Sequence, residues 1–206
     1  AYMAGQVDGE FLNKVNAHYY IEFEKQNLNI ANLEKNINLM IRKNDILRLI
    51  LLSDGRGIIL EKVPEYKVFK YQYNSKEGRY KMRKILSHMK YNIETWPMFK
   101  FVVGKKINGR NKNDVLHISF DCSILDAWSA GNMIYKLFAL YEGEKISFSD
   151  VSYKDYVKNL RIYKELAFNK KLLNEAEKYW NKMIKTLPKA PNLRTKIPIN
   201  NLEEYN

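Results

Sequence analysis

Cysteine is almost absent from this chain of 206 residues, in which Cys122 stands alone. A single cysteine excludes a disulfide within the chain and is usual for the reducing cytosol, so we expect a cytoplasmic protein. No apolar run approaches the ~18 residues of a membrane-spanning helix, and the first residues lack the basic and apolar segments of a secretory signal. The sequence therefore predicts no membrane partner.

Histidine is also scarce, with three residues in the chain. His18 and His88 show no metal-ligand spacing with each other or with Cys122. No glycine-rich loop of the kind that binds phosphates occurs either. We therefore expect no bound metal and no cofactor that this chain holds directly.

Acidic residues are also few. The chain has 23 of them against 35 lysines and arginines, which gives a net charge of +12. Such an excess favours acidic partners, whether nucleic acid, anionic lipid or protein. The basic residues are spread along the chain in pairs such as Lys105-Lys106, without a long basic run. This spread argues against nucleic acid as a partner. We interpret the excess of basic residues as charged, solvent-exposed faces of the protein together with a compositional bias of the sequence.

The spacing of the apolar residues predicts strands and helices in mixed order. Asn29 suits the N-cap of the first helix, and Gly143 suits the end of the third. The pair Asp54-Gly55 and the polar segment 108–113 are typical of hairpin turns. We expect strands at 17–24, 46–52, 58–63, 68–73, 98–107 and 114–120, and helices at 30–43, 76–89, 127–141, 152–168 and 170–186.

This mixture predicts an α/β layered domain with a mixed β-sheet packed with helices. The tail from Pro188 to Asn206 is polar and irregular and resembles a linker. A strand that runs through a short loop into a helix, at 115–128, lies where such folds tend to place chemistry. Side chains expected to face inward on two of the helices are Tyr80, Ile85, Leu86, Met89, Trp128, Met133, Ile134, Leu137, Phe138 and Tyr141.

Two carboxylates and a serine mark this junction, in the segment DCSILDAWS at 121–129. Asp121 ends an apolar strand, Asp126 stands one residue before the helix, and Ser129 follows three residues later. Asp126 is well placed as an N-cap, because its carboxylate can accept hydrogen bonds from the free N–H groups of the first turn. A cap is thus one interpretation of the carboxylate, and a catalytic role is the other.

The pattern Asp121-x4-Asp126-x2-Ser129 is similar to the DxxxxDxxS signature of heterocyclization domains of nonribosomal peptide synthetases. This signature replaces the HHxxxDG motif of ordinary condensation domains, so Asp121 and Cys122 take the places of the two His residues. Further segments resemble the family in the same order, namely AYMAGQ at 1–6, HYYIEFE, KNDILRLILLSDGRGIIL, SYKDYV and AEKYWNKMIKTLPKAP. The chain is identified as a member of this family over nearly its whole length.

The resemblance implies the first of two chloramphenicol-acetyltransferase-like lobes that enclose a tunnel. The chain would then be the first half of a two-lobed condensation-type domain about twice as long. Residues 1–187 would form the N-terminal lobe, and residues 188–206 would be a linker towards the C-terminal lobe. An adenylation domain is expected further downstream.

The resemblance also implies the activity. Heterocyclization domains join an acyl group on an upstream peptidyl carrier protein to the amine of a Cys, Ser or Thr on a downstream carrier, and cyclodehydrate the product to a thiazoline or oxazoline. The phosphopantetheine arms of both carriers enter as substrates. In the family, a Thr and an Asp of the second lobe are most often given the proton transfers, so the isolated lobe is expected to be inactive.

For this lobe, the resemblance implies an ion pair between Arg48 and Asp126 that brings the first hairpin against the motif loop. Asp121 is expected to face the tunnel, either as a base or as a residue that orders the loop. Cys122 is interpreted as a small buried apolar residue, because no sequence neighbour would lower its thiol pKa. His117 is expected to pack within its strand, and lining of the tunnel is the alternative.

Three alternatives remain open at this point. An ordinary amide-forming condensation domain or a stand-alone acyltransferase would require His at 121–122, where the chain has Asp121 and Cys122. A non-catalytic lobe that docks acidic carrier proteins agrees with the net charge. Nucleic-acid binding from charge alone would show a steep salt dependence.

Overall fold

The structure is a computed structural model that describes residues 17–107 and 113–189. The chain divides into two compact units, Ala1–Asp150 and Val151–Asn206. Three sequence predictions lie outside the described residues: the opening segment 1–6, residues 108–112 of the second hairpin turn, and residues 190–206 of the linker. The expected lobe boundary at residue 187 stays a prediction.

A four-stranded mixed sheet forms the centre of the first unit. Its strands are β1 (His18–Gln26), β4 (Phe69–Tyr73), β5 (Phe99–Lys106) and β6 (Asn113–Asp121), in the order β1-β6-β5-β4. Strand β6 runs antiparallel to both β1 and β5, whereas β4 is parallel to β5. The predicted α/β layered domain with a mixed sheet is confirmed.

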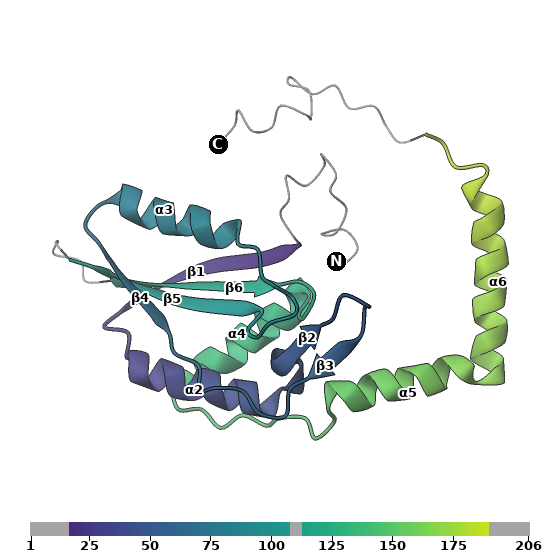
Figure 1. The fold of residues 1–206 in the computed structure, drawn as a ribbon, viewed down its shortest axis with the longest axis horizontal. Coiled ribbons are helices and arrows are strands. Elements are labelled where there is room, and N and C mark those ends of the chain that lie inside the picture. Colours follow the sequence, from purple (N-terminus) through teal and green to yellow (C-terminus); the bar gives the residue numbers. More distant parts are fainter. Residues whose placement is uncertain (1–16, 108–112, 190–206) are drawn as a thin grey trace. The chain divides into compact units, whose positions relative to one another are not determined.

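Helices cover both faces of this sheet. Helices α2 (Ile30–Lys43) and α4 (Ala127–Tyr141) lie against one face, and α3 (Lys76–Ser87) lies over the other (Figure 1). The predicted caps are confirmed, because the Asn29 side chain accepts a hydrogen bond from the Asn32 N–H and Gly143 follows α4 with a φ of 88°. This left-handed backbone conformation favours glycine.

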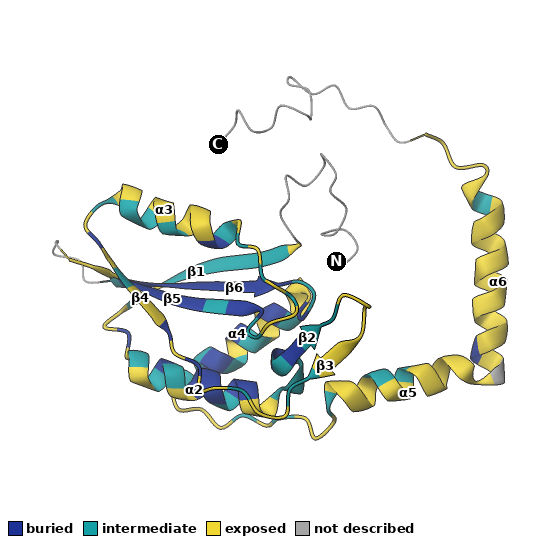
Figure 2. Cartoon of the chain, in the orientation of Figure 1, coloured by how far each residue is buried: buried dark blue, intermediate teal, exposed yellow. Residues whose placement is uncertain are grey.

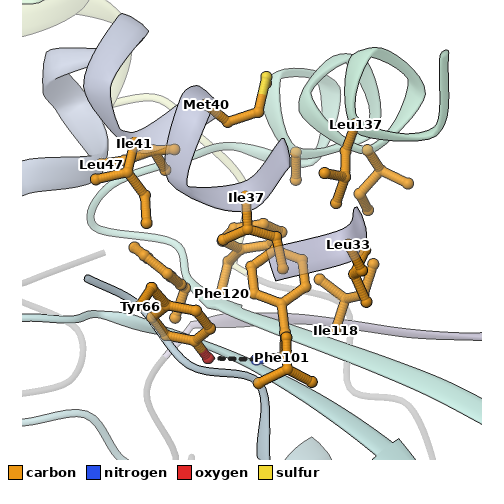
Figure 3. Close-up of a cluster of buried hydrophobic side chains, with 14 of the residues drawn as sticks. Leu33, Ile37, Met40, Ile41, Leu47, Tyr66, Phe101, Ile118, Phe120 and Leu137 are labelled. Carbon is orange, nitrogen blue, oxygen red and sulfur yellow. Dashed lines mark hydrogen bonds between the residues drawn. The ribbon is translucent and has the colours of Figure 1, made fainter. Parts of the chain in front are cut away.

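The apolar core fills the layer between the sheet and helices α2 and α4. Figure 3 shows side chains of α2 pointing towards those of β5 and β6, with Leu137 of α4 beside them. The Tyr66 hydroxyl accepts a hydrogen bond from the Phe101 N–H at 2.8 Å within this layer. The labelled members of the cluster are Leu33, Ile37, Met40, Ile41, Leu47, Tyr66, Phe101, Ile118, Phe120 and Leu137.

The inward face predicted for α3 is partly wrong. Leu86 is buried, but Tyr80 and Ile85 are 62% and 52% exposed. The helix turns Arg79 and Arg83 towards the sheet instead, where both bind Glu22 of β1. Two arginines four residues apart share one helix face. Because their partner is acidic, this face is polar, and the apolar pattern indicated the wrong rotation of the helix.

The first hairpin is shorter than predicted. Its strands are β2 (Leu49–Leu51) and β3 (Gly57–Ile59), paired antiparallel as expected from Asp54-Gly55. The segment Asp45–Arg48 forms a 3-10 helix, η1, instead of the start of a strand. This turn places Leu47 in the core.

Up to residue 189 the second unit forms two helices, α5 (Tyr153–Glu165) and α6 (Ala167–Ile184), close to the bounds predicted. The Ser152 hydroxyl caps α5 by accepting a hydrogen bond from the Asp155 N–H at 3.0 Å. Most side chains of both helices are exposed, in contrast to strands β5 and β6 (Figure 2). None of the helices in the described part of the chain is long and apolar enough to cross a membrane.

Candidate functional site at the end of strand β6

The candidate site is the point where β6 leaves the sheet and enters the loop before α4. The Asp121 N–H donates a hydrogen bond to the Met98 carbonyl at 3.0 Å, and the Cys122 N–H donates one to the Ala17 carbonyl at 2.9 Å. The Ile124 N–H then bonds the Asp121 carbonyl at 3.2 Å and closes a turn. Backbone bonds from both neighbouring segments thus hold the start of the loop.

Asp121 is buried at this junction, with 1% of its surface exposed. Its Oδ1 accepts a hydrogen bond from the Ser123 N–H at 2.8 Å. Its Oδ2 is buried and has no hydrogen-bond partner among the residues that the structure describes. A buried carboxylate oxygen without a donor is costly, so this atom is the point of the site that most needs a further partner.

Asp126 and Ser129 form the N-terminal cap of α4, as the sequence predicted. The Asp126 Oδ1 accepts a hydrogen bond from the Ser129 N–H at 2.7 Å. This bond lowers the pKa of Asp126, because the helix N-terminus stabilises the ionised carboxylate. Asp126 itself is exposed. Its carboxylate therefore has a structural role that requires no substrate.

Replacing Asp126 tests this role. Asp126→Ala should remove the cap and lower the melting temperature by about 2–4 °C, whereas Asp126→Asn should leave it nearly unchanged because Asn caps as well as Asp. Thermal unfolding followed by circular dichroism measures both variants. Equal destabilisation by Ala and Asn would show that the carboxylate charge has a role other than the cap.

The predicted ion pair between Arg48 and Asp126 is wrong. The Arg48 guanidinium donates from Nη1 to the carbonyls of Ile41 and Arg42, at 2.6 and 3.0 Å, and from Nε to the Leu60 carbonyl at 2.9 Å. Helix C-termini carry unpaired carbonyls that attract cations, so Arg48 closes the end of α2. The charge of Arg48 is therefore satisfied at the C-terminus of α2, and the charge of Asp126 at the N-terminus of α4.

Cys122 and Trp128 also belong to this junction, and neither lies in surroundings typical of a catalytic residue. Cys122 is half-buried, and burial and then the Asp121 charge raise the pKa of its thiol. A raised pKa disfavours the thiolate, which is the nucleophilic form.

Trp128 was expected in the core, but it is 86% exposed because the buried stripe of α4 runs through Ala130, Ile134 and Leu137.

A polar layer lies beneath α3 on the sheet face that carries Asp121. His117 of β6 is fully buried there, as the prediction of strand packing required. Its Nδ1 lies 2.7 Å from the Tyr20 hydroxyl and its Nε2 lies 2.8 Å from the Tyr71 hydroxyl. The Tyr20 hydroxyl in turn donates to Glu22 Oε1 at 2.6 Å.

These contacts define the proton positions on His117. An ionised Glu22 only accepts, so the Tyr20 hydroxyl gives its proton to Glu22 and must accept one from Nδ1. Nε2 then accepts from the Tyr71 hydroxyl, and the neutral imidazole is fully satisfied. Burial lowers the pKa of His117 to about 4, against the opposing charge of Glu22. The imidazole is therefore neutral near pH 7.

Gly104 makes room for this arrangement. It lies opposite Tyr71 in the parallel pair of β4 and β5. A Cβ atom at Gly104 would stand 2.5 Å from the Tyr71 ring. The absence of a side chain at this position thus allows the tyrosine ring to cross strand β5 and reach His117.

The lowered pKa of His117 predicts an acid-dependent loss of stability. The unfolded imidazole, with a pKa of 6.5, binds a proton that the folded one binds only near pH 4. Stability should therefore be full above about pH 6.5 and fall by roughly 2–3 kcal/mol as the pH drops to about 4. Urea unfolding at several pH values measures the slope. A His117→Gln variant should flatten it, leaving the smaller part due to His18, whose pKa is also lowered by burial.

Sequence reasoning missed the other members of the polar layer. Glu22 accepts hydrogen bonds from Arg79 and Arg83, and Arg79 also pairs with Glu24. Burial alone would raise the pKa of Glu22, but its bonds to Arg83, Tyr20 and Arg79 hold it well below its usual range. The signal in the sequence is the alternation of polar side chains at 18, 20, 22 and 24, which places all four on one face of β1.

The sequence and the fold agree with one family of known proteins. The sequence profile described as "Condensation domain" matches residues 10–203. The chain belongs to the condensation-domain family. This covers both units of the chain, including helices α5 and α6.

Three known proteins resemble this condensation-domain chain in sequence or in fold. Phenyloxazoline synthase MbtB of Mycobacterium sp. (strain MCS) is 23% identical over 183 residues, which are 88% of this chain and 15% of that protein. The EpoB cyclization-docking bidomain from Sorangium cellulosum superposes with a TM-score of 0.78 at 22% identity, over 98% of this chain and 40% of that one. The condensation domain of the monacolin K polyketide synthase MokA gives a TM-score of 0.62 at 15% identity, over 94% of this chain and 43% of that one.

The condensation-type chain thus spans well under half the length of these relatives. Its share of the EpoB bidomain, 40%, corresponds to one lobe of a condensation-type domain. The predicted fold class, the first half of a two-lobed domain, is confirmed at this level. In residues 17–107 and 113–189, no group of His, Cys, Asp and Glu side chains gathers as a metal site.

Proposed function

We propose that this chain is the N-terminal lobe of a heterocyclization domain in a nonribosomal peptide synthetase. The supporting observation is the junction after β6, where a buried carboxylate, Asp121, occupies the motif position at which amide-forming relatives carry an imidazole. Two relatives whose names refer to an oxazoline and to cyclization support the same assignment. The completed domain would accept two carrier proteins, whose phosphopantetheine arms are substrates.

The proposed reaction has two stages. The amine of a carrier-bound Cys, Ser or Thr attacks the donor thioester, and the donor's thiol leaves as the amide forms. The side-chain thiol or hydroxyl then adds to the new amide carbonyl, and loss of water leaves the C=N bond of a thiazoline or oxazoline. Bringing both arms to one point supplies much of the acceleration, and the remainder requires proton transfers.

Within this lobe, Asp121 is the residue that could take part in such transfers, since its Oδ2 has no partner among the described residues. Asp126 is assigned the structural part, because its carboxylate caps α4. The Thr and Asp of the second lobe that the family uses would complete the site. The lobe by itself is therefore proposed to be inactive.

The test uses the polypeptide that contains this chain together with the segment that completes the domain. It is supplied with a donor-loaded carrier and with Cys-, Ser- or Thr-loaded acceptor carriers, and the released products are weighed. A product lighter than the amide by one water supports heterocyclization. An amide without loss of water would instead indicate an ordinary condensation domain, and absence of any product would indicate a lobe that only docks carriers.

A further inference from the structure

His18 lies directly across from Asp121. In the antiparallel pair of β1 and β6, His18 is the register partner of Asp121, so both side chains project from the same face of the sheet. Both stand at the end of the sheet from which the motif loop departs. Burial lowers the pKa of His18, and the charge of Asp121 is one of the interactions that oppose this shift.

The imidazole of His18 is held in one orientation. Its Nε2 lies 3.2 Å from the Ser119 hydroxyl, which itself lies 2.6 Å from the Tyr91 hydroxyl. The Tyr91 ring stacks on the imidazole with centroids 6.2 Å apart. If Tyr91 donates along its short bond, the Ser119 proton points to Nε2 and the remaining proton of the neutral ring is on Nδ1.

Each of these two facing residues has one polar side-chain atom left over. His18 Nδ1 and Asp121 Oδ2 are both buried and both lack a hydrogen-bond partner among the described residues. The other polar atom of each side chain is hydrogen-bonded. His18 Nε2 pairs with the Ser119 hydroxyl, and Asp121 Oδ1 accepts from the Ser123 N–H. With the proton on Nδ1, one atom is a donor and the other an acceptor, which is the combination that a bridging hydroxyl or water satisfies.

We propose that His18 is a positioning residue for Asp121, which orients the free carboxylate oxygen through a shared bridging group. The proposal depends on the proposed function only for the claim that Asp121 serves acyl joining. Burial lowers the pKa of His18, while the carbonyls of Leu86 and Met89 and the charge of Asp121 raise it. His88, at the end of α3, opposes them weakly when it is protonated.

The first test measures the coupling without any reaction. The chain contains three histidines, so a titration of ¹⁵N-labelled imidazoles by NMR resolves His18 once His18→Gln and His88→Gln have assigned the signals. Asp121→Asn should lower the pKa of His18, because the carboxylate charge is lost. His117, which titrates in the Glu22 network, serves as the internal control.

An unchanged pKa of His18 in Asp121→Asn would overturn the proposal. Should this variant fail to fold, the reverse measurement takes its place: in His18→Gln the ¹³C carboxyl signal of Asp121 should move, because its bridging partner is lost. An unchanged carboxyl signal would equally contradict the proposal. The matched control, His88→Gln, removes an exposed imidazole whose charge lowers the pKa of His18, so it should not lower that pKa as Asp121→Asn does.

The second test uses the completed domain. His18→Gln should lower kcat about 10- to 100-fold with little change in KM, because only the orientation of a reacting group is lost. In the Asp121→Asn background, the same change should have no further effect on kcat. Additive losses would mean that His18 acts independently of Asp121, and that would contradict the proposal. If the wild type releases an amide without loss of water, the proposed function fails, while the coupling measured by NMR still decides the role of His18.

Discussion

Replacing Glu22 with Gln is expected to lower the free energy of unfolding by about 3 kcal/mol, since removal of one partner leaves the others of a buried charged network uncompensated. The Glu22 side chain is 10% exposed and accepts hydrogen bonds from Arg79, Arg83 and Tyr20. Gln would keep the volume but lose the charge that binds both guanidinium groups. The value stands at the low end for buried pairs, because Arg83 is half-exposed and its charge is partly screened.

The matched control for this change is Glu24→Gln. Glu24 lies two residues further along the same face of β1 and also pairs with Arg79, but its side chain is 45% exposed. Its loss should cost at most about 1 kcal/mol. Urea unfolding followed by far-UV circular dichroism compares the two variants. Similar costs for Glu22 and Glu24 would contradict the view that burial makes this network important.

The second large effect concerns catalysis by the completed domain, in which Asp121→Asn should slow product formation about 100-fold or more, at the lower end of what a proton-transferring group contributes. Asn retains an oxygen that can accept the Ser123 N–H bond, so the loop should keep its shape. The change removes the charge and the proton-accepting capacity of Oδ2. Single-turnover assays with mass detection should show slower ring formation.

The control for Asp121 is the other acidic residue of the motif. Asp126→Asn retains the cap of α4 and should leave the rate within about threefold of the wild type, since the carboxylate is engaged at the helix N-terminus. A large loss at Asp126 and a small one at Asp121 would reverse the roles assigned here. Circular dichroism of both variants excludes unfolding as the cause of a slower rate.

The sequence predicts the larger part of the fold because the elements carry strong local signals. The bounds of α2 and α4 agree with their apolar periodicity and with the caps Asn29 and Gly143. The hairpin of β5 and β6 follows from two apolar runs around a polar turn. These signals depend on residues close together in the chain, so they require no knowledge of what packs against them.

The wrong predictions concern features that depend on a residue far away in the sequence. The rotation of α3 depends on Glu22, which lies more than fifty residues earlier and attracts Arg79 and Arg83 to the sheet. Arg48 has free carbonyls of α2 within reach, and these compete with any carboxylate for its guanidinium. The pairing of His18 with Asp121 depends on the register of β1 and β6, which the sequence of neither strand specifies alone.

The apolar side chains displayed by α5 and α6 have a practical consequence for anyone who prepares residues 1–206 as an isolated fragment. Among them, Phe168 is 71% exposed, Ile184 61% and Trp180 55%. Large apolar groups left in water promote self-association as the protein concentration rises, so such a fragment should bind hydrophobic dyes and has to be kept dilute. Expression boundaries placed beyond the segment that completes the domain are therefore the better choice for enzymology and crystallisation.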